Sequence, residues 1–265
     1  MISCINLLGG NNMNQTQDFT KGVIWKQLLF FFFPILIGSF FQQLYNTVDT
    51  IIVGQAVGTS ALAAVGSTGN LTSLIVNFYV GLSTGASVVI AQYYGAQNNK
   101  KIHQAVHTSY SLAIVSGILM MLFGLFFSYQ CLDAIGTPHD ILNDATLYMQ
   151  LYFLCMIPGA IYNIGAGILR AVGDSKRPLY YLIVCSIVNV VFDFIFVVIF
   201  HQGIAGAAIA TVIAQSVCAI LVTIQLMRTN EVYKLTLSKM KFHLPVLKKI
   251  IMIGAPAGIQ STMYS

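Results

Sequence analysis

The stretch "LYYLIVCSIVNVVFDFIFVVIF", residues 179–200, is a run of mostly apolar side chains interrupted by Asn189 and Asp193. Its length fits the roughly 17–25 residues that a helix needs to cross the hydrocarbon core of a bilayer. One helical turn separates Asn189 from Asp193, so both side chains lie on the same helix face. The stretch therefore predicts a membrane-spanning helix that carries a carboxyl group and contains no lysine or arginine to neutralise it.

The composition of the whole chain points to the same class of protein. Of its 265 residues, 57% are hydrophobic and only 8% are charged, and the mean hydropathy is +0.78. Soluble domains usually have about a quarter charged residues. No strand-like alternation is sustained anywhere, as a membrane β-barrel would require. We predict an all-α integral membrane protein, surrounded by the lipid bilayer.

Apolar stretches of membrane-spanning length recur along the chain, and a further one begins near Lys249. They cover residues 25–53, 61–92, 104–128, 144–168, 179–200 and 204–227. Before the fourth stretch, Thr137-Pro138 predicts a helix start with a threonine cap. We expect a cytoplasmic segment at 1–23, a six-helix transmembrane lobe at 24–228, a cytoplasmic linker at 229–248, and the start of a seventh helix at 249–265. Met1 and Met13 both remain possible as the first residue of the protein.

The basic residues give the orientation of these spans. With six spans, all 13 lysines and arginines fall on one side of the membrane: Lys21, Lys26, Lys100, Lys101, Arg170, Lys176, Arg177, Arg228, Lys234, Lys239, Lys241, Lys248 and Lys249. Cytoplasmic loops retain basic residues, so we expect a multi-pass protein of the cell membrane with a cytoplasmic N-terminus. The same distribution accounts for the net charge of +5 without a nucleic-acid partner.

A weak internal repeat accompanies this topology. "KQLLFFFFPILIGS" begins at Lys26 and "KKIIMIGAPAGIQS" begins at Lys248, with a proline and a final serine at the same positions of each. Many transporters are built from two related halves. The repeat predicts that the chain is one half of such a protein and the first turns of the second half, a truncated second lobe.

Polar side chains inside the spans are candidates for function, since a charged group at the bilayer centre costs about 2.5–3.5 kcal/mol on insertion scales. Two of the eight acids, Asp49 and Asp193, fall within spans. Gln42, Asn46 and Asp49 share one helix face, with Tyr45 beside them; Asn189 and Asp193 form a second stripe, and Thr211 lies among small residues on the sixth span. With no basic residue in any span, a proton or a bound Na⁺ would neutralise the carboxyl groups.

Each of these residues also has a purely structural explanation. Thr211 could be a packing residue, Asn189 an interhelical hydrogen-bond donor, and Asp49 a residue of the wetter interface. The five cysteines have no CxxC spacing and are best explained as small hydrophobic residues of the core. The five histidines have no metal-ligand spacing. We therefore expect no catalytic residue, no enzyme and no cofactor.

Several longer stretches together resemble the multidrug and toxic compound extrusion (MATE) family of prokaryotic type. They are "PILIGSFFQQLYNTVDTIIVGQAVGTSALAAVGSTG" (34–69), "GLSTGASVVIAQYYGA" (81–96), "AGILRAVGDSKRPLYY" (166–181), "NVVFDFIFV" (189–197) and "GIAGAAIATVIAQ" (203–215). The resemblance implies an antiporter that admits Na⁺ or H⁺ while cationic amphipathic compounds leave. It also implies that Asp49, Asn189, Asp193 and Thr211 form the ion-coupling site, with Gln42, Tyr45 and Asn46 as candidates for the substrate cleft.

Three alternatives stay open. A lipid-linked oligosaccharide flippase of the same superfamily would favour cationic residues in the central cleft. An intramembrane aspartyl protease using Asp49 and Asp193 would need a Gly-x-Gly-Asp context, which "NVVFD" lacks. The third is a truncated, non-functional product, because family members have two six-helix lobes and a missing C-terminal lobe would have to be supplied for transport.

Overall fold

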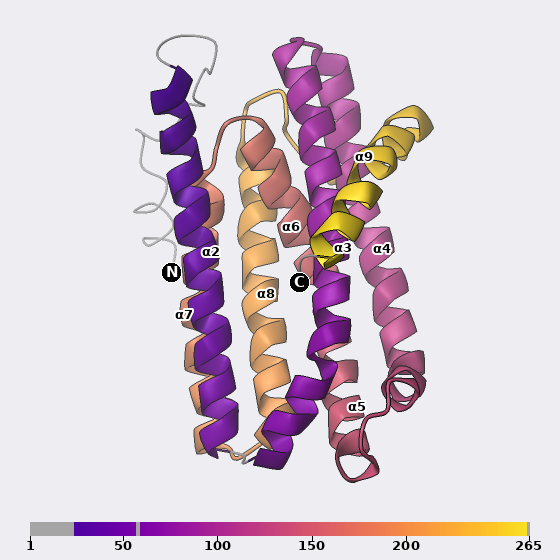
Figure 1. Ribbon diagram of the computed structural model, residues 1–265. Coiled ribbons are helices and arrows are strands. Elements are labelled where there is room, and N and C mark those ends of the chain that lie inside the picture. Colours follow the sequence, from indigo (N-terminus) through magenta and orange to yellow (C-terminus); the bar gives the residue numbers. More distant parts are fainter. Residues whose placement is uncertain (1–23, 57–58, 264–265) are drawn as a thin grey trace.

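The computed structural model describes residues 24–56 and 59–263, and these residues form helices without any strand (Figure 1). In chain order the elements are α2 (Ile24–Ala56), α3 (Thr59–Gly95), α4 (Asn99–Ala134), α5 (His139–Phe153), α6 (Met156–Ala171), α7 (Lys176–Asp193), the π-helix η1 (Phe194–Ile199), α8 (Gly203–Arg228), the 3₁₀-helix η2 (Leu237–Lys239) and α9 (Leu244–Met263). The all-α prediction is confirmed. The predicted segment 1–23 lies outside the described residues.

The helices have the lengths that a bilayer requires. Five are long and apolar enough to cross a membrane, and the pair α5 and α6 makes a sixth if it counts as one bent span. Most helices run past the predicted apolar stretches at one or both ends, because polar residues continue the helix beyond the hydrocarbon region. One end of the bundle gathers the start of α2, the α3–α4 and α6–α7 junctions and the α8–α9 connector (Figure 1). These segments and the first turns of α9 carry all the basic residues within the described ranges.

The fourth span is broken rather than continuous, unlike the single stretch predicted at 144–168. Helices α5 and α6 meet at a bend of 46° around Leu154 and Cys155. Pro158 explains the break, since it has no N–H to bond the Leu154 carbonyl and its ring clashes with that carbonyl. By contrast, α2 continues as one helix through Pro34.

The predicted threonine cap before this span is wrong. Helix α5 begins at His139 with Pro138 in the cap position, and it has no side-chain capping hydrogen bond. The Thr137 hydroxyl is buried without a hydrogen-bond partner among the described residues. Proline sets the helical φ angle and needs no N–H partner at a helix start, so the helix can begin without the threonine.

The bundle is held together by close contacts between small residues. Ser83 and Ser87 of α3 donate hydrogen bonds to the carbonyls of Asn163 and Gly167 on α6, at 2.6 and 2.9 Å. Small residues let the helix backbones approach closely enough for such bonds, as is usual in membrane bundles. Helix α2 packs mainly against α7 at the edge of the bundle.

Helix α9 crosses α3 through glycines on both helices (Figure 1). Gly81 and Gly85 of α3 face Gly254 and Gly258 of α9, and a methyl group at Gly254 would lie 2.9 Å from the Gly81 carbonyl oxygen. Glycines four residues apart bring two helix backbones into direct contact. Helix α9 begins at Leu244, earlier than the predicted start near Lys249, because Pro245 is suited to the first helical turn.

The two repeat segments adopt similar local structure. Both Pro34 and Pro256 lie inside helices, α2 and α9. Ser39 and Ser261, at matching positions, donate hydrogen bonds to the carbonyls of Ile35 and Ala257, four residues earlier, at 3.1 and 3.0 Å. Other serines and threonines of the described helices make the same bond, so the repeat stays a prediction.

Candidate functional site

Asp193 is the most deeply buried acid of the described chain. Its side chain is 0% exposed, and neither carboxylate oxygen has a hydrogen-bond partner among the described residues. Asn189 precedes it by one turn on α7 and is also buried. The helix therefore places both side chains inside the protein, on the shared face that their spacing predicted.

A change of helix type follows Asp193 directly. Residues 194–199 form the π-helix η1, in which the Phe200 N–H bonds the Ile195 carbonyl at 2.9 Å. Gly206 of α8 allows this wider turn to pack closely, since a methyl group there would lie 3.1 Å from the Phe196 backbone. Single π-turns occur often at functional sites. Nothing in the apolar sequence FIFVVI indicated this irregularity.

Thr211 of α8 joins the α7 pair. Its hydroxyl lies 3.5 Å from the Asn189 amide nitrogen, which donates to it, and itself donates to the Ala207 carbonyl at 3.1 Å. This arrangement leaves the Asn189 amide oxygen buried and without a hydrogen-bond partner among the described residues.

Asp49 approaches the same site from α2. Helix α2 packs against α7 and η1, and the carboxyl groups of Asp49 and Asp193 are close enough to interact electrostatically. Asp49 is half-buried, and its Oδ1 atom is buried without a hydrogen-bond partner within the described chain. The structure thus gathers Asp49, Asn189, Asp193 and Thr211 into one cluster.

Three further residues belong to this region, and the sequence analysis missed them. Tyr148 of α5 interacts electrostatically with both Asp49 and Asp193, and Tyr152 interacts with Asp49. The two tyrosine rings stack with their centroids 6.1 Å apart. Gln215 lies one turn beyond Thr211 on α8 and has a buried, unpartnered Oε1 atom among the described residues. The four-residue spacing of both pairs was the available signal, but only the fold brings α5 next to α8.

The predicted cleft residues are more exposed than the residues of the buried cluster. Gln42 and Asn46 are exposed on α2. The side chain of Tyr45 lies outside the described part of the structure. Gln42 and Asn46 therefore face outward from the lobe, whereas Asp49 is partly covered by neighbouring helices.

The buried cluster is made almost entirely of hydrogen-bond acceptors. Four oxygens, from Asp49, Asn189 and both positions of Asp193, are buried without a donor in the described chain. The described part of the chain contains no group of three histidine, cysteine or acidic residues arranged for a metal ion. Carboxylate, amide and hydroxyl oxygens are ligands suited to hard cations, and a carboxylate can also hold a proton.

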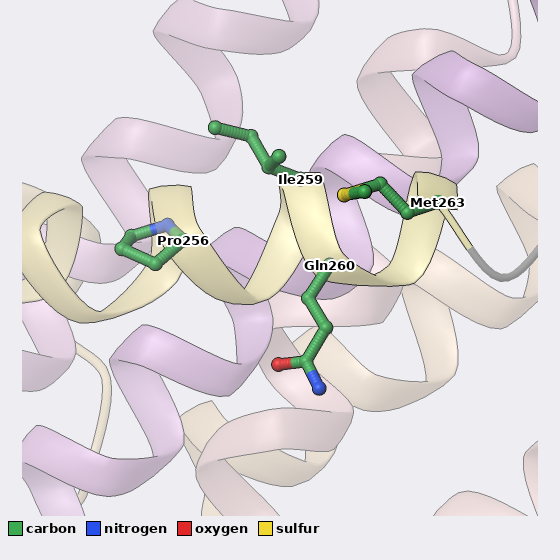
Figure 2. A pocket seen from close by; sticks show the side chains of 4 residues that line it. All are labelled: Pro256, Ile259, Gln260 and Met263. Atoms are coloured by element: carbon green, nitrogen blue, oxygen red, sulfur yellow. The ribbon is translucent and has the colours of Figure 1, made fainter.

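A pocket of about 520 Å³ lies elsewhere, on α9. It is lined by Pro256, Ile259, Gln260 and Met263, and Figure 2 shows all four side chains projecting from this one helix. Ile259 and Met263 are 65% and 82% exposed. This pocket is an open apolar face of α9 and is separate from the polar cluster on α2, α5, α7 and α8.

Comparisons with known proteins agree with this architecture. A family model described as MatE matches residues 34–195. The "Probable multidrug resistance protein YoeA" of Bacillus subtilis (strain 168) is 29% identical over 259 residues, covering 94% of this chain and 56% of the relative. A structure of a MOP superfamily transporter from Pyrococcus furiosus, whose reverse-polarity binding pocket is said to suggest a different function, superposes with a TM-score of 0.86 at 26% identity, covering 95% of this chain and 55% of that one.

A multidrug resistance MATE family transporter in an outward-facing conformation superposes with a TM-score of 0.83 at 27% identity, covering 89% of this chain and 52% of that one. The chain thus spans about half the length of the relatives that it matches. The matched region runs from Pro34, within α2, to Ile195, just after α7, and so includes Asp49, Asn189 and Asp193. From the family match, the helical fold and the apolar spans, we conclude that the chain belongs to the MATE family of multidrug transporters.

Proposed function

We propose that the chain forms the first lobe of an antiporter that couples the entry of Na⁺ or H⁺ to the export of cationic amphipathic compounds. The observation that carries this proposal is the Asp193 carboxyl group, which is fully buried with both oxygens unpartnered among the described residues. Such a group is costly inside a membrane protein unless a cation or a proton occupies it. Asp49, Asn189 and Thr211 supply the remaining oxygens of the proposed site.

The arrangement suits ion coupling because no basic side chain of the described residues competes with the bound ion for the two carboxyl groups. Among the described residues no lysine or arginine forms an ion pair with Asp49 or Asp193. Occupied and empty states of the cluster therefore differ by a net charge inside the lobe. A helix packing that depends on this charge would link ion binding to the position of α2 and α7, and so to the opening of a cleft between lobes.

The substrate class follows from the sign of this charge. A lobe with buried carboxyl groups and basic residues only near the helix ends attracts cations and disfavours anions. A lipid-linked oligosaccharide flippase would need cationic residues near the middle of the spans, so this feature supports the drug exporter. The relative YoeA carries a multidrug resistance name. Transport would also require a C-terminal lobe, and the basic helix ends support a cell-membrane location with a cytoplasmic N-terminus.

Cation binding by the purified chain tests the site directly. We expect Na⁺ to raise the unfolding temperature in neutral detergent relative to an equal concentration of K⁺ at fixed pH, and expect Asp193→Asn to abolish this difference. If the site takes only protons, Na⁺ and K⁺ will have the same effect on the unfolding temperature. The variant will then take up fewer protons than the parent chain when the solution is acidified.

The control variant is Asp144→Asn, which makes the same substitution at an exposed position of α5. It should behave as the parent chain in the Na⁺ measurement. Equal responses of the parent and Asp193→Asn chains to Na⁺ and to protons would refute the coupling site. In cells, with a second lobe supplied, Asp193→Asn should stop ethidium efflux driven by an imposed ion gradient while membrane expression persists.

A further inference from the structure

A second polar site lies at the end of the bundle where the basic residues gather. It is a pocket of about 430 Å³ between the start of α4 and the α8–α9 connector, residues 229–243. We call it the basic pocket; its lining residues are Lys100, His103, Gln104, Ser238, Lys239, Lys241 and His243. The lining contains three lysines and two histidines and no acid, so the pocket is suited to an anion.

The positive charge around this pocket is not compensated by the rest of the described chain. None of the lysines at 100, 101, 239, 241, 248 and 249 forms an ion pair with a described residue. Lys101 and Lys249 instead both lie over the ring of Tyr93, each 5.5 Å from its centroid. His103 interacts with the positive charge of Lys239 and stacks on His107. Such crowding of like charges is unfavourable without a bound anion.

The connector is fixed in place over the start of α4. The buried His107 donates from Nδ1 to the His103 carbonyl at 2.8 Å and accepts the Thr236 N–H at Nε2 at 3.1 Å. Thr108 accepts the His243 N–H at 3.2 Å. These bonds hold both walls of the basic pocket together, so the site is formed before any ligand arrives.

Exposed apolar side chains adjoin the lining residues of the basic pocket in sequence, on the connector and at the start of α9. Leu237, Phe242 and Leu244 are 46%, 43% and 74% exposed, and they alternate in sequence with Ser238, Lys241 and His243 of the lining. A free inorganic anion would gain nothing from these apolar side chains. A phospholipid would, since its phosphate needs basic groups and its acyl chains need apolar contacts.

We propose that the basic pocket binds the phosphate of an anionic phospholipid headgroup. Lys100, Lys239 and Lys241 contact the phosphate, and Leu237, Phe242 and Leu244 lie against the acyl chains. This lipid joins α4 to the connector that leads into α9. The described histidines do not form a metal site with other ligands, so a metal ion does not compete for this assignment.

Binding of a short-chain phosphatidylglycerol to the delipidated chain in neutral detergent, measured by native mass spectrometry, tests the proposal. The pocket variant is Lys239→Gln with Lys241→Gln. The matched control is Arg228→Gln with Lys234→Gln, which removes the same charge from exposed positions on the same end but outside the basic pocket. We expect roughly thirtyfold weaker binding by the pocket variant, the size expected for two lysines near a membrane surface, and little change in the control.

Further arms separate the ligand sources. Phosphatidylcholine should bind weakly to all variants, inorganic phosphate should not displace phosphatidylglycerol at equal concentration, and Phe242→Ser should weaken lipid binding. Effective displacement by inorganic phosphate would overturn the lipid assignment in favour of a free-phosphate site. Equal loss in the pocket and control variants would show general charge attraction and overturn the pocket. Lys100→Gln, on α4, provides an independent test if the connector variant unfolds.

Discussion

The Asn189 amide nitrogen of α7 donates a hydrogen bond to the Thr211 hydroxyl of α8 across 3.5 Å. Because that hydroxyl gives its own proton to the Ala207 carbonyl, it acts only as an acceptor toward Asn189. The bond orients the amide so that its oxygen joins the unpartnered carboxylate oxygens of the cluster. Thr211, for which the sequence left open a packing role or a place in the ion-coupling site, thus orients a neighbouring side chain.

Removal of this hydroxyl should affect ion binding more than folding. We expect Thr211→Val to lower the stability of the chain by about 1 kcal/mol, the usual net contribution of one hydrogen bond, and to weaken stabilisation by the coupling ion. Thr211→Ser retains the hydroxyl and should preserve both. Thermal unfolding in detergent, with and without Na⁺, measures the two effects. Identical ion responses of the valine and serine variants would contradict the orienting role.

Replacement of Asp193 by an apolar residue of the same branched shape should stabilise the empty protein. A buried carboxyl without partners is costly, and apolar replacements of buried charged groups often gain about 1–4 kcal/mol. We therefore expect Asp193→Leu to raise the unfolding temperature in K⁺ buffer while losing any response to Na⁺. A fall in unfolding temperature would show that Asp193 contributes to folding through a partner.

The glycine contact between α3 and α9 should tolerate no side chain. A methyl group at Gly85 would lie 2.7 Å from the Gly254 nitrogen, whereas one at Gly69, on the same helix, has no neighbour within 4 Å. We expect Gly85→Ala to cost about 1–3 kcal/mol through overpacking. Gly69→Ala should be neutral or stabilising by about 0.5–1 kcal/mol. Thermal denaturation of both variants in detergent measures this difference. Equal changes in stability for Gly85→Ala and Gly69→Ala would contradict the close contact.

His107 should hold the connector through its ring nitrogen. In the His107→Phe variant the partly buried Thr236 N–H loses its acceptor, which costs about 1 kcal/mol. We expect faster hydrogen exchange at Thr236 and neighbouring connector amides, measured by mass spectrometry. His139→Phe, at an exposed position of α5, is the control and should leave the connector protected. Unchanged protection in His107→Phe would mean that other contacts hold the connector.

Gly124 and Phe153 should form a coupled pair. The Phe153 ring packs directly on the backbone of Gly124, where α4 meets α5, and it is 1% exposed. We expect Gly124→Ala to destabilise the chain by overpacking and Phe153→Ala to cost about 3–5 kcal/mol through a cavity. The double variant should be more stable than the sum of both losses predicts, because the added methyl group fills part of the cavity. Strict additivity would argue against the contact.

The helical class and the spans could be predicted from the sequence because each depends on local hydrophobicity. Residues 179–200 and 204–227 match α7 with η1 and α8 closely. The break before Pro158 and the early start of α9 at Pro245 are also local effects, although the length of the apolar stretches concealed them. The candidate pair Asn189 and Asp193 followed from helical spacing alone.

The sequence by itself thus determined a membrane bundle, the side on which its charges gather, and the face of α7 that carries a carboxyl group. The family resemblance implied that Asp49 and Thr211 join this group, but only the tertiary structure decided how: Asp49 from α2 and Tyr148 from α5 lie near the carboxyl group, and Thr211 from α8 bonds the neighbouring Asn189. The physical reason is the distance along the chain over which each kind of interaction acts. Hydrophobic length and helical period act within one segment, whereas the electrostatic and hydrogen-bonding partners of a buried group come from segments that only packing brings together.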